Sequence, residues 1–192
     1  MARLKEREVY FSTDIETDGP IPGPHSMLSL GSAAFSGNGT VLDTFEVNFE
    51  TLPDAVGEKS TMEWWASQDD AYAKTRVNTQ SPEVGIKKFV DWVRTFEGSP
   101  VFVGYPATFD FMFVYYYTIK FLGPGTSPFS FSALDIKSFA MAKLGSTFRG
   151  TTKRNMPRHW FRDTGSHTHV AIEDAIEQGH LFCNILRESN RG

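Results

Sequence analysis

The sequence lacks the features that mark secreted, membrane-spanning and disulfide-stabilised proteins. Its 192 residues include a single cysteine, Cys183, which cannot form an internal disulfide and fits a reducing compartment. No uninterrupted apolar segment approaches the roughly 20 residues that cross a bilayer, and no apolar run follows residues 1–6 as it would in a signal peptide. We therefore expect a cytoplasmic protein that has no membrane partner.

Repeats, low-complexity tracts and linkers are also missing. The length falls within the roughly 100–200 residues usual for one domain, so residues 1–192 are predicted to form a single domain whose core runs from about residue 8 to about residue 188. Hydrophobic residues make up 40% of the chain and aromatic residues 14%, which indicates an aromatic-rich core. The net charge of −4 gives no sign of a polyanionic partner.

The order of the periodic segments predicts an α/β fold. Strand-like alternation covers residues 9–17, 27–35 and 41–49, and Asn38-Gly39 is a strong hairpin signal, so these strands should form an antiparallel meander. Two further strands are expected at residues 101–104 and 130–135. Helices are expected at residues 60–76, from 81 to no further than 98, and at 106–122, 136–144 and 168–187. This order predicts a mixed five-stranded sheet flanked by helices.

Two of the helices carry more detailed expectations. The first is predicted to begin with a capping box, Ser60-Thr61-Met62-Glu63. The second is predicted to turn Val84 toward the core. Trp64 and Trp65 are expected to pack in the core or between helices, and the alternative is a surface on which nucleobases stack.

Two acids lie close together on the first predicted strand. Asp14 and Glu16 share one parity of the alternation, so their side chains leave the same face about 6–7 Å apart. Like charges held so close cost free energy unless a proton or a cation neutralises them. Because hard divalent cations take carboxylate oxygens as ligands, the pair predicts a metal site. Taken alone, it also fits a solvated strand end.

Two more acids have the context of site residues, each with a plainer alternative. Asp110 lies among apolar residues in the first turns of a helix, where the dipole stabilises a carboxylate but an embedded acid also needs a partner. Asp174 falls outside the apolar stripe of the last helix, and Glu173 and Glu177 are expected to share a solvated face with it. His169 precedes Asp174 by five positions, about 140° around a helix. The two can therefore serve one site only if His169 lies in the loop or the first turn.

The order of these residues resembles a known enzyme family. Three elements carry the resemblance: Asp14-x-Glu16, the segment 104–110 that ends at Asp110, and His169-x-x-x-x-Asp174. They resemble the three motifs of the DEDDh branch of the DEDD 3′–5′ exonucleases, which includes the polymerase proofreading subunit, ribonuclease T and oligoribonuclease. The resemblance extends from residue 9 to about residue 187 and implies a ribonuclease-H-like fold.

The resemblance also implies an activity. It implies a two-metal-dependent 3′–5′ exonuclease that hydrolyses phosphodiester bonds from the 3′ end of single-stranded DNA or RNA, or of short oligonucleotides, and releases nucleoside monophosphates. The four acids would hold two Mg²⁺ or Mn²⁺ ions about 3.5–4 Å apart. His169 would be the general base. His167 is the competing candidate, and the spacing from Asp174 favours His169.

One departure from the family pattern stands in the second motif, where Tyr105-Pro106 replaces the His-Asn of many relatives. The family's residues at these positions support the site and are not metal ligands. Two alternative functions stay open: a nuclease restricted to di- and oligoribonucleotides, and a catalytically degenerate nucleic-acid-binding module. The choice between DNA and RNA is open as well, and so is a homodimer, because many stand-alone relatives are dimers.

Residues 145–168 form a long segment without helical or strand periodicity. Five basic side chains stand against one acid, Asp163, so the segment carries +4 in a chain of net charge −4. The basic residues are Arg149, Lys153, Arg154, Arg158 and Arg162, interleaved with Phe148, His159, Trp160 and Phe161. Because such surfaces grip single strands through phosphate contacts and stacking, we expect the segment to bind the 3′-end strand and to bring His169 into place. The alternative is a solvated basic loop with Trp160 filling the core.

The family also wedges the terminal base with apolar residues. These residues follow the first motif and lie near the second strand in relatives. By resemblance, the equivalents in this sequence are Ile15, Met27 and Phe113.

Overall fold

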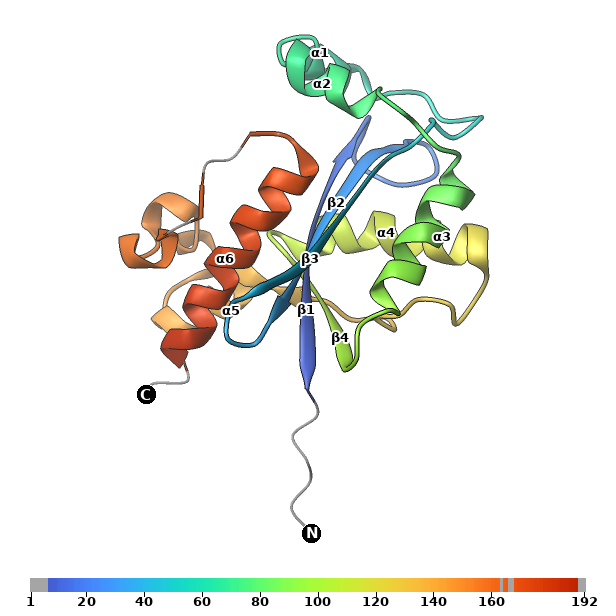
Figure 1. Cartoon of the computed structure of the whole chain (residues 1–192). Helices are drawn as coiled ribbons and strands as arrows, with labels where there is room; N and C mark the ends of the chain where they lie inside the picture. The colour runs from blue at the N-terminus through green and yellow to red at the C-terminus, as the bar shows by residue number, and fades with distance from the viewer. Residues whose placement is uncertain (1–6, 163, 166–167, 190–192) are drawn as a thin grey trace.

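A mixed sheet of five strands forms the centre of the molecule (Figure 1). The computed structural model describes residues 7–162, 164–165 and 168–189. The strands are β1 (Glu8–Thr17), β2 (Met27–Ser36), β3 (Val41–Asn48), β4 (Ser99–Gly104) and β5 (Leu134–Asp135), in the spatial order β3-β2-β1-β4-β5. β2 pairs antiparallel with β1 and β3, whereas β1–β4 and β4–β5 are parallel. The predicted sheet and its antiparallel meander are confirmed.

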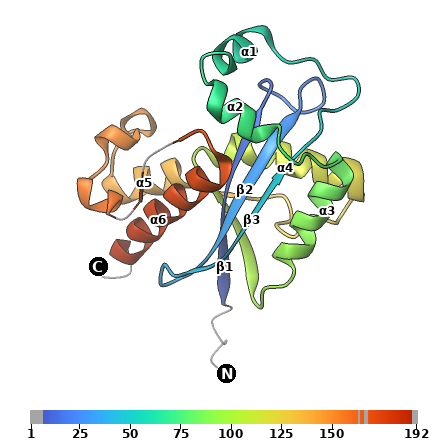
Figure 2. The same cartoon turned by 45° about the horizontal axis from the view of Figure 1, so that its top comes forward.

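Helices cover both faces of this sheet. One face is covered by α3 (Pro82–Val93) and α4 (Ala107–Leu122), and the other by α5 (Ile136–Leu144) and α6 (Ala171–Ser189). Two short helices, α1 (Lys59–Trp65) and α2 (Asp69–Thr75), lie over the end of the sheet where β1 finishes (Figure 2). Three 3₁₀ turns, η1 (Phe148–Gly150), η2 (Lys153–Asn155) and η3 (Arg158–Phe161), follow α5. None of the helices within the described residues has the length and apolar character needed to cross a membrane.

The alternation of β1 decides which face receives the acids. Phe11 and Ile15 belong to the core cluster that packs against α3 and α4. Tyr10, of the opposite parity, packs against the cluster on the α6 side, where its ring lies 4.9 Å from that of Phe182. Asp14 has the parity of Tyr10, so its side chain leaves the sheet on the α6 side.

The predicted helix at residues 60–76 is two helices. Ser67 breaks it, because its hydroxyl donates to the Trp64 carbonyl at 2.6 Å and thereby competes with the helical backbone bonding. The N-cap of α1 is Glu58, whose carboxylate accepts from the Thr61 amide at 2.8 Å, so the predicted capping box at Ser60 was wrong.

Two other expectations also need correction. Val84 is 47% exposed, because the inward side of α3 is centred on Ile86 and Phe89, and a residue two positions before Ile86 lies about 200° away from it. The last strand is only Leu134–Asp135 instead of residues 130–135. Ser130 has a φ of 57°, a left-handed conformation that a strand cannot contain.

Candidate active site

The end of β1 is held in place by contacts from β2 and α1. Asp14 lies opposite Gly31 of β2, and the register shifts after Glu16, at the bulge before Thr17. Beyond the bulge, the Thr17 carbonyl accepts a hydrogen bond of 2.9 Å from the indole of Trp65. This anchored strand end presents Asp14 and Glu16 side by side, as the alternation predicted.

Asp110 approaches the same strand end from α4. It lies in the first turn of that helix and is 4% exposed. A Cβ at Gly104 would lie 3.1 Å from Asp110 Oδ2, so the glycine that ends β4 leaves room for the carboxylate. The helix start itself is fixed by Asp135, which accepts from the Ala107 amide at 3.0 Å. The structure thus favours the site interpretation of Asp110 over that of a solvated helix-start charge.

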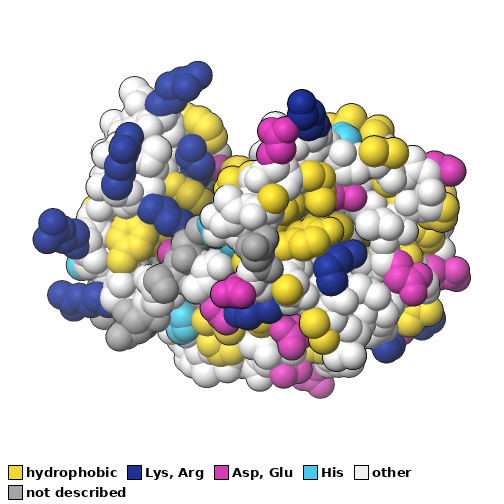
Figure 3. Space-filling model, turned by 90° about the horizontal axis from the view of Figure 1, so that it is seen from above, with side chains coloured by type: hydrophobic (Ala, Val, Ile, Leu, Met, Phe, Trp, Pro, Cys, Tyr) yellow, Lys and Arg dark blue, Asp and Glu magenta, His cyan; other side chains and the backbone are white. Residues whose placement is uncertain are grey.

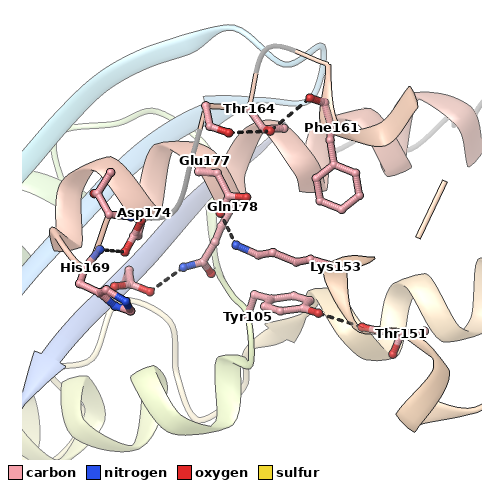
Figure 4. Close-up of polar contacts among 12 residues, drawn as sticks. Tyr105, Thr151, Lys153, Phe161, Thr164, His169, Asp174, Glu177 and Gln178 are labelled. Carbon is pink, nitrogen blue, oxygen red and sulfur yellow. Dashed lines mark hydrogen bonds and ion pairs between the residues drawn. The ribbon is translucent and has the colours of Figure 1, made fainter. Parts of the chain in front are cut away.

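Asp174 lies in the first turn of α6 and is fully buried. Its Oδ1 accepts from the Thr168 amide at 2.8 Å and its Oδ2 from the His169 amide at 2.9 Å (Figure 4). These bonds hold His169 in the loop before α6 with a φ of 58°, a conformation that costs a non-glycine residue free energy. The solvated-face alternative for Asp174 was therefore wrong.

Close packing of α6 on the sheet brings Asp174 near the acids of β1. A Cβ at Gly31 would lie 2.2 Å from the Ile172 backbone nitrogen, so only glycine lets the first turn of α6 lie directly on β2. Gly31 is also the residue opposite Asp14 in the β1–β2 register. The glycine therefore sets the distance between the acids of β1 and the acid of α6.

The carboxylates converge closely enough to change each other's titration. Ligand atoms of Glu16, His169 and Asp174 all lie within 4.8 Å of one another. Burial, followed by the charges of Asp14, Asp174 and Asp110, raises the pKa of Glu16 from 4.5 to about 9. Burial and the charge of Asp14 likewise hold the pKa of Asp110 well above its usual range. Carboxylates gathered in this way are residues that could hold a cation, which would offset their mutual repulsion.

Aromatic packing fixes the ring of His169. The ring of Trp64 meets it edge to face, with centroids 4.9 Å apart. Trp64 also packs on Trp65 at 4.6 Å. Trp65 is buried and Trp64 partly exposed, so of the two tryptophans Trp64 is the one that faces the site. No local sequence pattern indicates this contact, because it joins two segments that lie far apart in the chain.

Two neighbours on α6 were missed as parts of the site. Gln178 Nε2 donates to Asp14 Oδ1 at 2.6 Å, and Glu177 forms an ion pair with Lys153 of η2 (Figure 4). Glu177 is buried, so its predicted position on a solvated face was wrong. The signal that could have found both is their position three and four residues after Asp174, on the same side of a helix.

The substrate-binding predictions divide between surface and core. Arg149, Arg154 and Arg158 are exposed, and Lys and Arg side chains gather on the lobe that α5 and residues 145–162 form (Figure 3). Lys153 is instead engaged by Glu177. Trp160 is fully buried and its indole donates to Glu188 at 2.7 Å, so it fills the core and offers no stacking surface.

The three predicted wedge residues are also interior. Ile15, Met27 and Phe113 all belong to the cluster between β1, α3 and α4, and none is more than 5% exposed. Their size and apolar character suit a core as well as a wedge, and in this structure the core takes them. His167, the competing candidate for the general base, lies outside the described residues.

Comparisons with known proteins identify the family of the chain. A family model described as the 3′–5′ exoribonuclease Rv2179c-like domain matches residues 9–186. The 3′–5′ DNA exonuclease Cap18 of Escherichia coli is 30% identical over 190 residues, which cover 97% of this chain and 96% of that protein.

Solved structures share the fold at low sequence identity. The nuclease domain of 3′hExo, a DEDDh family member bound to rAMP, superposes with a TM-score of 0.72 at 11% identity, covering 96% of this chain and 94% of that one. E. coli exonuclease I in complex with a dT13 oligonucleotide gives a TM-score of 0.70 at 12% identity, covering 96% and 42%. The Mg²⁺- and Mn²⁺-bound form of S. pombe Pop2p gives 0.65 at 14%, covering 92% and 82%. The ribonuclease-H-like fold and the predicted resemblance are thereby confirmed, and the chain belongs to the Rv2179c-like family of 3′–5′ exonucleases.

Proposed function

We propose that residues 1–192 act as one metal-dependent exonuclease domain that removes nucleoside monophosphates from the 3′ ends of single-stranded nucleic acid or short oligonucleotides. The observation that carries the proposal is the buried placement of Glu16 among three other acids: burial, followed by the charges of these acids, raises the pKa of Glu16 to about 9. Burying several carboxylates together costs free energy unless a cation compensates their charge. Its donor set, carboxylates beside an imidazole, suits Mg²⁺ or Mn²⁺.

Asp14, Glu16, Asp110 and Asp174 are the residues that would hold two such ions. When bound, a pair of divalent ions activates water and stabilises charge on the attacking and leaving oxygens of a phosphodiester. Pop2p, which shares the fold, has been solved with Mg²⁺ and Mn²⁺ bound. Metal binding would deprotonate these acids, and as carboxylate ligands they would position the ions for the reaction.

His169 would take the proton from the attacking water. The water oxygen forms the new bond to phosphorus, the bond from phosphorus to the 3′ oxygen of the preceding nucleotide breaks, and the proton passes to the imidazole. The contacts of His169 suit this role: its amide is fixed by Asp174, and its ring packs on Trp64. The nucleotide released is a 5′-monophosphate.

The exposed arginines Arg149, Arg154 and Arg158 would bind phosphates of the strand that leads to the site. E. coli exonuclease I binds a dT13 oligonucleotide on the same fold. The double charge reversal Arg154→Glu/Arg158→Glu should raise KM for long oligonucleotides and flatten the salt dependence of KM, because counterion release scales with phosphate contacts. Lys87→Glu/Lys88→Glu, the same change of charge on two exposed residues of α3, is the matched control and should leave both unchanged. Equal kinetics in all three proteins would remove the arginines from the substrate path.

The central test uses 5′-labelled DNA and RNA oligonucleotides with Mg²⁺ or Mn²⁺, and Asp14→Ala as the inactive control. A ladder of products from the 3′ end supports the exonuclease, cleavage of dimers alone supports an oligonucleotide-restricted nuclease, and no cleavage supports a degenerate binding module. The sugar is the second readout, because the family model is described as an exoribonuclease whereas Cap18 is a DNA exonuclease. A homodimer and a cytoplasmic location remain predictions.

A further inference from the structure

Gln178 links the last helix to the acid-bearing strand. Its side chain is 2% exposed, and its Nε2 donates to Asp14 Oδ1 at 2.6 Å. The bond joins positions 164 residues apart in the sequence. Asp174 lies one helical turn earlier on the same helix, so one side of α6 contributes both an acid of the site and a donor to another acid (Figure 4).

The orientation of this amide is set by Asp14. Among the described residues, Gln178 Oε1 has no hydrogen-bond partner although it is buried. Buried acceptors without partners are rare in native proteins and require an explanation. In this position the explanation is the other end of the amide, because Asp14 Oδ1 accepts a hydrogen bond and therefore takes the NH₂ group, which leaves Oε1 pointing elsewhere.

The charges around Asp14 explain why an amide is suited to this position. A lysine on Asp14 would cancel the negative charge that attracts a cation, whereas a neutral amide orients the carboxylate and leaves its charge in place. A lysine does contact this part of α6: Lys153 is paired with Glu177, and its Nζ lies 5.4 Å from the ring centroid of Tyr105. Of these two consecutive residues, Glu177 thus pairs with the lysine and Gln178 contacts Asp14.

We propose that Gln178 is a positioning residue, which holds the Asp14 carboxylate in the orientation that binds the metal ions. The inference rests on the proposed metal-dependent function. Hydrogen-bond partners of metal ligands fix ligand orientation, and their loss commonly weakens metal affinity about 10- to 100-fold.

The test measures metal affinity directly. Gln178→Met keeps the length of the side chain and removes the donor, and Gln178→Glu keeps the shape and replaces the donor with an acceptor. Mn²⁺ affinity is measured by isothermal titration calorimetry, and melting temperature is measured in EDTA. Gln178→Met should bind Mn²⁺ about 10- to 100-fold more weakly, Gln178→Glu at least as weakly, and both should melt close to the wild type in EDTA. Gln80→Met, which removes an amide from a side chain that pairs with Lys88, is the control and should bind Mn²⁺ like the wild type.

Kinetics add a readout that a purely structural role would not give. With Gln178→Met, raising the Mn²⁺ concentration should restore kcat and leave KM for the oligonucleotide unchanged, because the defect lies in metal occupancy. A wild-type protein that binds no Mn²⁺ and cleaves nothing would overturn the proposed function. A wild-type protein that binds Mn²⁺, with Gln178 variants that bind it equally well, would overturn the role of Gln178 alone. If Gln178→Met melts early in EDTA, the affinity of Gln178→Glu decides the question in the same way.

Discussion

Replacing Glu16 by glutamine should abolish cleavage and at the same time stabilise the metal-free protein. Burial and three neighbouring acids raise the pKa of Glu16 from 4.5 to about 9, so the folded protein keeps a proton that the unfolded chain releases. Between these two pH values the unfolded state binds fewer protons, and the free energy of unfolding falls as the pH rises. Glutamine has the same shape and no proton to lose.

The size of the effect follows from the pKa values. A pH of 7 lies about 2.5 units above the pKa of 4.5 that Glu16 has in the unfolded chain. Each unit corresponds to about 1.4 kcal/mol in the free energy of unfolding. At pH 7 the free energy of unfolding of the wild type is therefore about 3 kcal/mol lower than that of Glu16→Gln. For a chain of 192 residues this corresponds to a melting temperature about 6–12 °C higher. Below pH 4.5 both side chains are neutral, and the difference should disappear.

Urea unfolding in EDTA at pH 4, 5.5 and 7 measures the predicted gap. With Mg²⁺ at 100 times its dissociation constant the gap should nearly close, because the wild type gains about 2.7 kcal/mol from binding and the variant has lost a ligand. Asp91→Asn, on an exposed carboxylate of α3, is the control for removing one negative charge. A Glu16→Gln protein that is no more stable than the wild type at pH 7 in EDTA, or a gap that is equally large at pH 4, would refute the reasoning.

Three further predictions concern contacts around the site. Trp64→Ala should lower kcat about 2- to 10-fold, since an aromatic pair contributes about 0.5–1.5 kcal/mol, whereas Trp64→Phe should retain most of the activity; steady-state kinetics distinguish the two. Lys153→Met leaves the buried Glu177 carboxylate without its cation and should lower the free energy of unfolding, measured in urea, by about 3–5 kcal/mol. The double variant Lys153→Met/Glu177→Gln should recover much of this loss. By the same assay Trp160→Ala should lower the free energy of unfolding by about 3–5 kcal/mol. Phe131→Ala, at a side chain that is 82% exposed, should stay within about 0.5 kcal/mol of the wild type. Similar losses in these two variants would contradict the burial of Trp160.

Short-range periodicity explains which parts of the structure were predictable. The parity of β1 placed Asp14 and Glu16 on one face, and a spacing of five residues placed His169 in the loop before α6; both rules depend only on local geometry. The break between α1 and α2 depends on one side chain, Ser67, that competes with the helical backbone. A propensity argument averaged over a window does not detect a single competitor of this kind.

Contacts between distant segments explain what was missed. Glu177 was expected in solvent because helical periodicity identifies one buried face, whereas η2 packs Lys153 against a second. Trp160 was a candidate for stacking because an aromatic residue in a basic segment has the same sequence pattern whether it faces a base or the core. Only its burial against the α6 side of the sheet distinguishes the two.

The pairing of Asp14 with Gln178 also bears on how the enzyme comes into being. The acids of β1 and the acid of α6 lie far apart in the sequence, and Gln178 of α6 stands 164 positions after Asp14, so α6 is synthesised long after β1. Until α6 docks on Gly31, the growing polypeptide carries at most three of the four carboxylates in place. The cluster of four acids is thus complete only after the last helix has folded onto the sheet.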